Sequence, residues 1–357
     1  MVARARKCGA LLLSLFLAGC NQGGTVRVLK LAYVLDTRHP VHQAMAYLGS
    51  RLEALSHGAL RLDIFPAGQL GGEREYLESL QVRSLDLAKV SSSVLENFVP
   101  SRAVFSLPYL FVDEKHKWRV LVGPLGRRLL LEGERYWLRG LCYYETGSRN
   151  FYLVNRPVLR PEDLHGLKIR VMQSYWSIRT VNTLGGSATP IAFGELYTAL
   201  QQGVVDGAEN NIPTFYESRH FEMCKYLILD GHSSPPDALV ISTHTWDRLQ
   251  PIERRWLEQA AEESVAYKRR LWATAVEQDL AAVRRAGVQV IVPDVESFRQ
   301  RVQVLYEELR HSHHDLYRLV EEIRSAAAPE ESHPLAYLEQ RHPDEDTAQK
   351  AVAEAAP

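Results

Sequence analysis

Residues 161–211, PEDLHGLKIRVMQSYWSIRTVNTLGGSATPIAFGELYTALQQGVVDGAENN, decide the fold. In LKIRV, residues 167–171, apolar side chains alternate with Lys168 and Arg170, which predicts a strand with one buried face. A helix-like segment that ends at Arg179 or Thr180, the turn LGGSATP and the helical run ELYTALQQG follow. A second strand, VVDGAEN, comes directly after. Strands alternating with helices in this way predict an α/β fold with parallel strands.

Two polar side chains stand where these two strands end. Arg170 closes the first strand and Asn210 closes the second. Ligands of such sheets gather at the carboxyl ends of parallel strands, so we expect both side chains to face a ligand cleft. The planar guanidinium donates two parallel hydrogen bonds and keeps its charge, which suits a carboxylate. The alternative is an ordinary structural ion pair for Arg170.

Further motifs occur in a fixed order along the chain. They are FPAGQLGGEREYLESLQVRSLDLAKV, FSLPYLF, GSRNFY, KIRV and PIAFGELYTALQQGVVDGAEN. Together they resemble the DctP-like solute-binding subunits of tripartite ATP-independent periplasmic (TRAP) transporters, over about residues 28 to 324. The resemblance implies a two-lobed periplasmic binding protein with a mixed sheet in each lobe, hinge strands and a long helix spanning both lobes. The run from Pro251 to about Gly287, which has no internal helix breaker, is the candidate for that helix.

The resemblance also implies a domain layout. Lobe I covers residues 28–150 with a returning segment at about 236–270. Lobe II covers 151–235 with a segment at about 280–324, and residues from about 295 to 325 are predicted to form one helix. Residues 325–357 carry seven acidic and two basic residues and form a mostly disordered tail.

The family's ligand contacts map onto matching positions of this chain. The carboxylate-binding arginine corresponds to Arg170, and the remaining ligand-binding residues are expected to be Asn210, Arg149, Glu73, His39, Asn211 and Phe193. Three of them have structural alternatives. Arg149 can instead brace the hinge, Glu73 can serve as the first-turn charge of a helix, and His39 can cap the helix that follows it.

DGAENN, ending in Asn211, is similar to the hexuronate-binding subset of the family, which points to a sugar acid as ligand. That subset carries a glutamate between an aspartate and a histidine on a later strand, where this chain has Asp230, Gly231 and His232. A contact from the glutamate is therefore expected to be missing. A C4-dicarboxylate, a 2-oxo acid and an aromatic acid stay open as ligands.

The amino terminus has the pattern of an export signal. Arg4, Arg6 and Lys7 precede an apolar run from about Gly9 to Leu17, which is too short to span a bilayer. The following LAGC resembles a lipobox, so residues 1–19 are the expected signal peptide and Cys20 the lipidated first residue of a segment 20–27. We expect a periplasmic protein that meets the membrane only through this anchor. Cleavage without lipidation is the alternative.

Composition narrows the function further. A net charge of −1 over 357 residues does not suggest nucleic-acid binding. Of the four cysteines, Cys142 and Cys224 stay internal and are expected to be free thiols in apolar surroundings. The chain has no metal-ligating cysteine pairs, no GxSxG or HExxH motif and no phosphate-binding lysine loop, so we expect no enzyme activity, no cofactor and no metal.

We therefore predict a monomeric extracytoplasmic receptor. It binds an organic acid, most of all a hexuronate, between two closing lobes and delivers it to TRAP membrane subunits for uptake driven by an ion gradient. Delivery to a membrane sensor kinase is the alternative.

Overall fold

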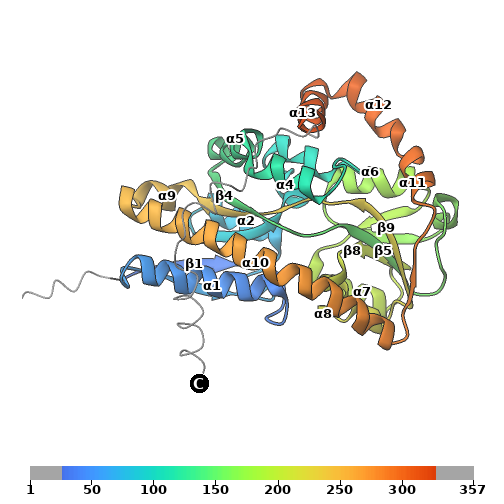
Figure 1. Cartoon of the computed structure of the whole chain (residues 1–357), viewed down its shortest axis with the longest axis horizontal. Helices are drawn as coiled ribbons and strands as arrows, with labels where there is room; N and C mark the ends of the chain where they lie inside the picture. The colour runs from blue at the N-terminus through green and yellow to red at the C-terminus, as the bar shows by residue number, and fades with distance from the viewer. Residues whose placement is uncertain (1–25, 327–357) are drawn as a thin grey trace, which may run out of the picture.

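The computed structural model describes residues 26–326 and contains two β-sheets side by side (Figure 1). The expected lipidation at Cys20, the signal peptide and most of the acidic tail lie outside these residues. The first sheet has the order β2-β1-β3-β10-β4 and the second the order β11-β9-β5-β8-β6-β7. The mixed α/β architecture predicted from the sequence is confirmed.

The first sheet has four strands in one direction and a single antiparallel strand, β10, between β3 and β4. Its strands are β1 (Arg27–Ala32), β2 (Leu60–Phe65), β3 (Leu87–Ser91), β4 (Leu138–Tyr144) and β10 (Asp237–Ser242). In the second sheet β5 is the antiparallel strand, paired with β8 and β9. Its strands are β5 (Arg149–Leu153), β6 (Lys168–Val171), β7 (Ser187–Pro190), β8 (Gly207–Asn210), β9 (Tyr226–Ser233) and β11 (Gln289–Ile291).

The antiparallel strands mark where the chain changes sheets. Residues 145–148 carry it from β4 into β5, and residues 234–236 return it from β9 to β10. At the first crossover Glu145 accepts hydrogen bonds from Lys117 (2.6 Å) and from the Gly147 amide (2.9 Å). Ser234, on the second crossover, donates to the Gly147 carbonyl oxygen (3.0 Å). The two crossovers are therefore hydrogen-bonded to each other between the sheets.

Helices pack against both sheets. They are α1 (Pro40–Leu55), α2 (Glu73–Gln81), α3 (Ser92–Leu95), α4 (Glu114–Val122), α5 (Pro124–Glu132), α6 (Tyr175–Thr183), α7 (Leu196–Gln201), α8 (Ile212–Glu217), α9 (Thr243–Arg248), α10 (Pro251–Arg285), α11 (Val295–Arg301), α12 (Gln303–Ser312) and α13 (His314–Ser325). Short 3₁₀ helices are η1 (Pro100–Ser106), η2 (Gly133–Tyr136), η3 (Pro161–Leu164), η4 (Phe193–Glu195) and η5 (His220–Glu222).

The long helix α10 runs past both sheets, as predicted (Figure 1). Pro251 occupies its first turn, where no helical N–H partner is needed, and Glu253 accepts a hydrogen bond from the Gln250 amide (2.7 Å). The helix packs on α1 and β4 in its first part and on α8 further along. It is the one helix of residues 26–326 with extensive contacts to elements of both sheets, and so it fixes how they sit together.

Three predictions of secondary structure were wrong. Residues 295–325 form three helices, with breaks at Val302 and His313. The first, α11, packs on β9 and η3, and the breaks turn the chain so that the last, α13, reaches η1. Consequently α13 packs on η1, beside the first sheet. The assignment of residues 280–324 to lobe II stays a prediction. Residues Ser187–Pro190, which the sequence predicts as part of a turn, form the strand β7 at the edge of the second sheet. The helix α6, predicted to end at Arg179 or Thr180, extends to Thr183.

Both internal cysteines, Cys142 and Cys224, are buried free thiols, as predicted. No helix among residues 26–326 combines the length and the apolar character needed to cross a bilayer.

Candidate ligand-binding cleft

One cavity lies between the two sheets, and all seven predicted ligand-binding residues line it. Arg149, Arg170, Phe193, Asn210 and Asn211 come from the second sheet and its connections, whereas His39 and Glu73 come from helix starts at the first sheet. The structure therefore brings together residues that are up to 172 positions apart in the sequence. Their contact with a ligand stays a prediction.

Arg170 lies at the end of β6 and is 2% exposed. Its Nε donates to the carbonyl oxygen of Ile191 (2.8 Å), and its guanidinium lies 5.9 Å from the centre of the Phe193 ring. Its Nη1 is buried and finds no hydrogen-bond partner within residues 26–326. Burial lowers the pKa of Arg170 from its usual value, as expected for a cation without a bound carboxylate. The structural ion pair considered from sequence is absent from this part of the chain.

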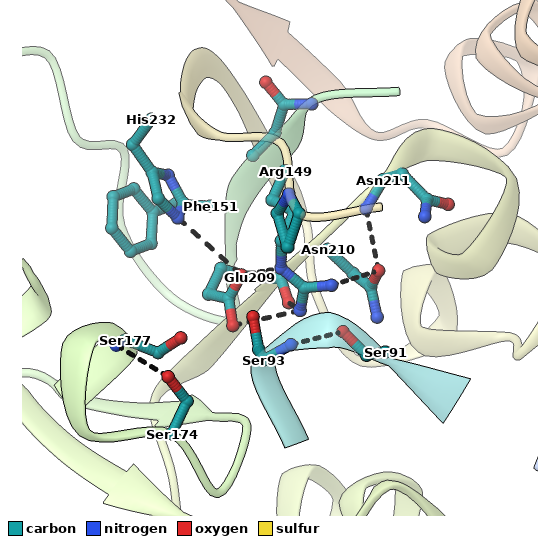
Figure 2. A network of polar contacts seen from close by, with 12 residues as sticks. Ser91, Ser93, Arg149, Phe151, Ser174, Ser177, Glu209, Asn210, Asn211 and His232 are labelled. Atoms are coloured by element: carbon teal, nitrogen blue, oxygen red, sulfur yellow. Dashed lines mark hydrogen bonds and ion pairs between the residues drawn. The ribbon is translucent and has the colours of Figure 1, made fainter. Parts of the chain in front are cut away.

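Arg149, on β5, is engaged with its neighbours (Figure 2). Its Nε donates to a carboxylate oxygen of Glu209, and its Nη2 donates to the other oxygen (3.0 Å) and to the Glu209 carbonyl oxygen (2.7 Å). Its Nη1 donates to Oδ1 of Asn210 (3.0 Å). These contacts join Arg149 to β8 of the same sheet, and Arg149 also borders the cavity. A role in bracing the hinge stays a prediction.

Glu209 links Arg149 to His232 (Figure 2). Nδ1 of His232 lies 2.7 Å from Oδ2 of Asp230, and its Nε2 lies 3.6 Å from Oε2 of Glu209. Burial alone would lower the pKa of His232, but the two carboxylates raise it to about 9, so the ring is protonated. Burial would likewise raise the pKa of Glu209, but Arg149 and His232 hold it at about 2. Four buried charges therefore compensate one another behind the cavity wall.

Asn210 is the last residue of β8, and Asn211 is the N-terminal cap of α8. The Oδ1 of Asn210 accepts from Arg149 and from the Asn211 amide (2.9 Å), which leaves the amide NH₂ group as the donor available to a ligand. The Oδ1 of Asn211 accepts from the Thr214 amide (2.8 Å) and so caps α8. Asn211 therefore combines a capping role with a place at the cavity.

His39 caps α1, which is the alternative considered from the sequence, and also borders the cavity. Its Nδ1 accepts from the Val41 amide (3.1 Å), so its Nε2 carries the hydrogen and points to Oγ1 of Thr214 (3.3 Å). Burial, together with Lys268 and Lys89, lowers the pKa of His39 far below its usual value. The neutral ring thus connects α1 to α8 across the cavity.

Glu73 begins α2 and accepts a hydrogen bond from the Ser91 amide (3.1 Å). Burial raises its pKa to about 7, against the opposing effect of Lys89, whose Nζ lies 3.9 Å away. Its position at a helix start agrees with the alternative role, and the same carboxyl lines the cavity.

The lining also contains residues that sequence reasoning did not predict as ligand contacts, among them Lys89, Asp237, Lys268 and Trp272. The amine of Lys89 donates to Asp237 (2.6 Å) across the β3–β10 pair. A lysine inside the buried strand LAKVS was a usable signal for Lys89. Gly231 is absent from the lining, and a Cβ atom there would lie 3.7 Å from Cβ of Ser148. The expected loss of a glutamate contact at position 231 stays a prediction.

The described residues hold no cluster of three or more His, Cys, Asp or Glu side chains that could bind a metal ion. The cavity instead offers a buried guanidinium, an amide and neutral hydrogen-bonding groups. This arrangement suits a small carboxylate that also carries hydroxyl groups.

Comparison with known proteins gives the same picture. Residues 31–312 match the family described as bacterial extracellular solute-binding protein, family 7 (DctP). The uncharacterized protein YiiZ of Salmonella typhimurium is 39% identical over 84% of this chain and 91% of its own length.

Two solved structures of TRAP periplasmic solute-binding proteins contain galacturonate. The protein from Bradyrhizobium is 38% identical, with a TM-score of 0.81, and the match covers 84% of this chain and all of that one. The protein from Xanthobacter autotrophicus is 34% identical, with a TM-score of 0.80, over 83% of this chain and 99% of that one.

Proposed function

The chain belongs to the DctP family of bacterial extracellular solute-binding proteins, and on that basis we propose that it is a TRAP receptor for a sugar acid, with a hexuronate as its ligand. The family is one of receptors and not of enzymes. The two galacturonate-bound relatives support the choice of ligand, since both align over more than four fifths of this chain.

The unpartnered Nη1 of Arg170 is the observation that carries the proposal. A buried guanidinium that lacks a hydrogen-bond partner is costly, and a ligand carboxylate removes that cost. Asn210 supplies a second donor from the neighbouring parallel strand. The carboxylate end of the ligand therefore lies against β6 and β8 of the second sheet.

Residues of the first sheet complete the site when the lobes close. Glu73 and His39 reach the cavity from the opposite wall and can hydrogen-bond ligand hydroxyls. A ligand that contacts both walls favours the closed state, because those contacts are made together only there. The closed receptor then docks on TRAP membrane subunits, and we propose that it does so as a monomer.

The direct test is isothermal titration calorimetry of D-galacturonate and D-glucuronate, with succinate, pyruvate, benzoate and D-galactose as comparison solutes. Hexuronates should bind most tightly. Arg170→Ala should weaken binding by about 100-fold or more, since two charge-assisted hydrogen bonds are lost. Without ligand, its melting temperature should stay close to that of the wild type, because Arg170 donates only one hydrogen bond among the described residues.

Arg160→Ala is the matched control, since Arg160 is 70% exposed and lies outside the cavity. Its affinity should equal that of the wild type. Unchanged hexuronate binding by Arg170→Ala would remove Arg170 from the site, and tighter binding of another acid would replace the hexuronate.

We further propose that Cys20 is lipidated and tethers the receptor to a membrane in the periplasm. The LAGC sequence supports this, although Cys20 lies outside the described residues. Cys20→Ser should move the protein from the membrane fraction to the soluble periplasmic fraction. An unchanged distribution of the variant would contradict lipidation.

A further inference from the structure

Lys268 is a second buried cation at the same cavity that has a nitrogen without a hydrogen-bond partner among residues 26–326. It lies on α10, is fully buried, and its Nζ contacts no acceptor among residues 26–326. The amine sits 3.8 Å from the centre of the Trp272 ring, one helical turn away. A cation over an aromatic face is favourable, but it leaves the N–H donors of the amine unused.

The neighbouring carboxylates are already occupied. Asp237 accepts from Lys89, and Glu73 accepts from the Ser91 amide while lying 3.9 Å from Lys89. Burial lowers the pKa of Lys268 to about 7, despite the opposing effect of Asp237 and Glu145. A buried amine in these surroundings is destabilising unless something in the cavity accepts its hydrogen bonds.

Lys268 and Arg170 lie on different walls. Arg170 belongs to β6 of the second sheet, whereas Lys268 borders Lys89 and Asp237, which are paired across β3 and β10 of the first sheet. A ligand whose carboxylate meets Arg170 would thus present its other end to Lys268.

The charges around the cavity suit a monoanion. Arg149 is paired with Glu209 and Lys89 with Asp237, whereas Arg170 and Lys268 have no ion-pair partner among residues 26–326. Glu73 is the remaining carboxyl group in the count, which sets four cations against three carboxylates. The exposed Arg74 and Glu75 cancel each other at the rim. A single positive charge is therefore in excess, and it stays in excess when Glu73 and Lys268 are both neutral. A second ligand carboxylate would bring an uncompensated negative charge into a buried site.

We propose that Lys268 donates a hydrogen bond to a hydroxyl oxygen at the end of the ligand opposite the carboxylate held by Arg170. The pocket consequently selects polyhydroxylated monocarboxylates over dicarboxylates of the same length. This inference rests on the proposed function, since it takes Arg170 as the carboxylate anchor.

The test compares D-galacturonate with galactarate, its dicarboxylate counterpart, by calorimetry on the wild type and on Lys268→Met. The wild type should bind galacturonate at least tenfold more tightly than galactarate. Lys268→Met should weaken galacturonate binding about 10- to 100-fold, as expected for a hydrogen bond from an amine. Without ligand, the same variant should melt at a higher temperature than the wild type, because a buried amine lacking an acceptor is gone.

Arg270→Met is the matched control, since it removes a cation from an exposed position of the same helix, outside the cavity lining. Its affinity should stay within twofold of the wild-type value. Lys268→Gln, which keeps a polar side chain, serves as the second variant and should weaken binding at least threefold.

The outcomes separate the two proposals. Wild-type affinity in either Lys268 variant would overturn the role of Lys268, and tighter binding of galactarate would overturn the selection of monocarboxylates. Both results leave the receptor function standing, provided that Arg170→Ala still weakens binding by about 100-fold or more. A wild type that binds neither acid would overturn the sugar-acid function and this inference together.

Discussion

Glu209 connects two buried cations, Arg149 and His232, so its removal isolates both. We expect Glu209→Gln to lower the free energy of unfolding by about 3–5 kcal/mol, since Arg149 would remain charged and buried without its partner. Urea denaturation measures the change. Glu258→Gln is the control, because Glu258 is 44% exposed and lies 3.5 Å from Arg139, a geometry that contributes below about 1 kcal/mol. Equal losses in the two variants would contradict the buried network.

Because of His232, the free energy of unfolding is expected to change with pH in the alkaline range. Its pKa of about 9 lies above the ordinary value of 6.5, so its contribution to stability is complete below pH 6.5 and disappears as the pH rises through 9. The groups that face the ring are Asp230, Glu209 and the stacked Phe151.

The difference in unfolding free energy between wild type and His232→Asn should therefore shrink by roughly 2–3 kcal/mol between pH 6 and pH 10. Other titrating groups are common to both proteins and largely cancel in this difference. Chemical denaturation across that range measures it. A difference that does not vary with pH would show that His232 is uncharged in the folded protein.

The sequence located the cavity but not all of its chemistry. Arg170 and Asn210 were predictable because each ends a short strand of a recognisable strand–helix–strand unit. Lys89 and Asp237 are 148 residues apart, so their ion pair appears only once β10 lies beside β3. Lys268 falls in a helix with many charged residues, and nothing local distinguishes it from its exposed neighbours.

Among the elements, the crossover that contains Gly147 lies directly against the long helix α10. Gly147 has φ +61°, and a side chain there would come within 3.2 Å of Nε1 of Trp272 on α10. Gly203 has a similar φ of +68° but nothing within 4 Å. A comparison of substitutions at Gly147 and Gly203 therefore separates the cost of backbone strain from the cost of crowding against α10.

Alanine at either position should cost about 1–2 kcal/mol for the left-handed backbone. Gly147→Ala should cost about 1–3 kcal/mol more, because the ring of Trp272 must move. Thermal or urea unfolding of both variants gives the comparison. Equal destabilisation would mean that the crossover and α10 adjust to each other freely.

Elements with strong periodicity or a clear first-turn signal were predictable, and irregular ones were not. The 35 residues of α10 contain no breaker after Pro251, so its length could be read directly. The edge strand β7 is only four residues long and ends in proline, which looks like a turn without its partner β6. The breaks at Val302 and His313 depend on the surfaces that α11 and α13 cover.

At the scale of the whole molecule, one hydrogen bond joins the segment after α3, on the side of the first sheet, to the segment after β6 of the second sheet. The side-chain amide of Asn97 donates a hydrogen bond (2.7 Å) to the carbonyl oxygen of Gln173, a residue that follows β6. We expect Asn97→Ala to weaken galacturonate binding about three- to tenfold by favouring the open state, with a faster dissociation rate. Stopped-flow and calorimetric measurements test this.

Asn155→Ala, at an exposed position away from the cavity, is the control and should leave affinity unchanged. An unaltered dissociation rate in Asn97→Ala would show that the Asn97 contact does not stabilise the closed state.

The exchange of strands between the sheets has a consequence for biosynthesis. Because β10 fills the gap between β3 and β4, the first sheet cannot be completed until residue 242 has been made, and the second waits for β11 at residue 291. Neither half can therefore fold early on the ribosome as a finished unit. During most of translation the strands of both sheets are therefore only partly paired, and the chain is not yet folded. A secretion channel requires its cargo in such an unfolded, extended state.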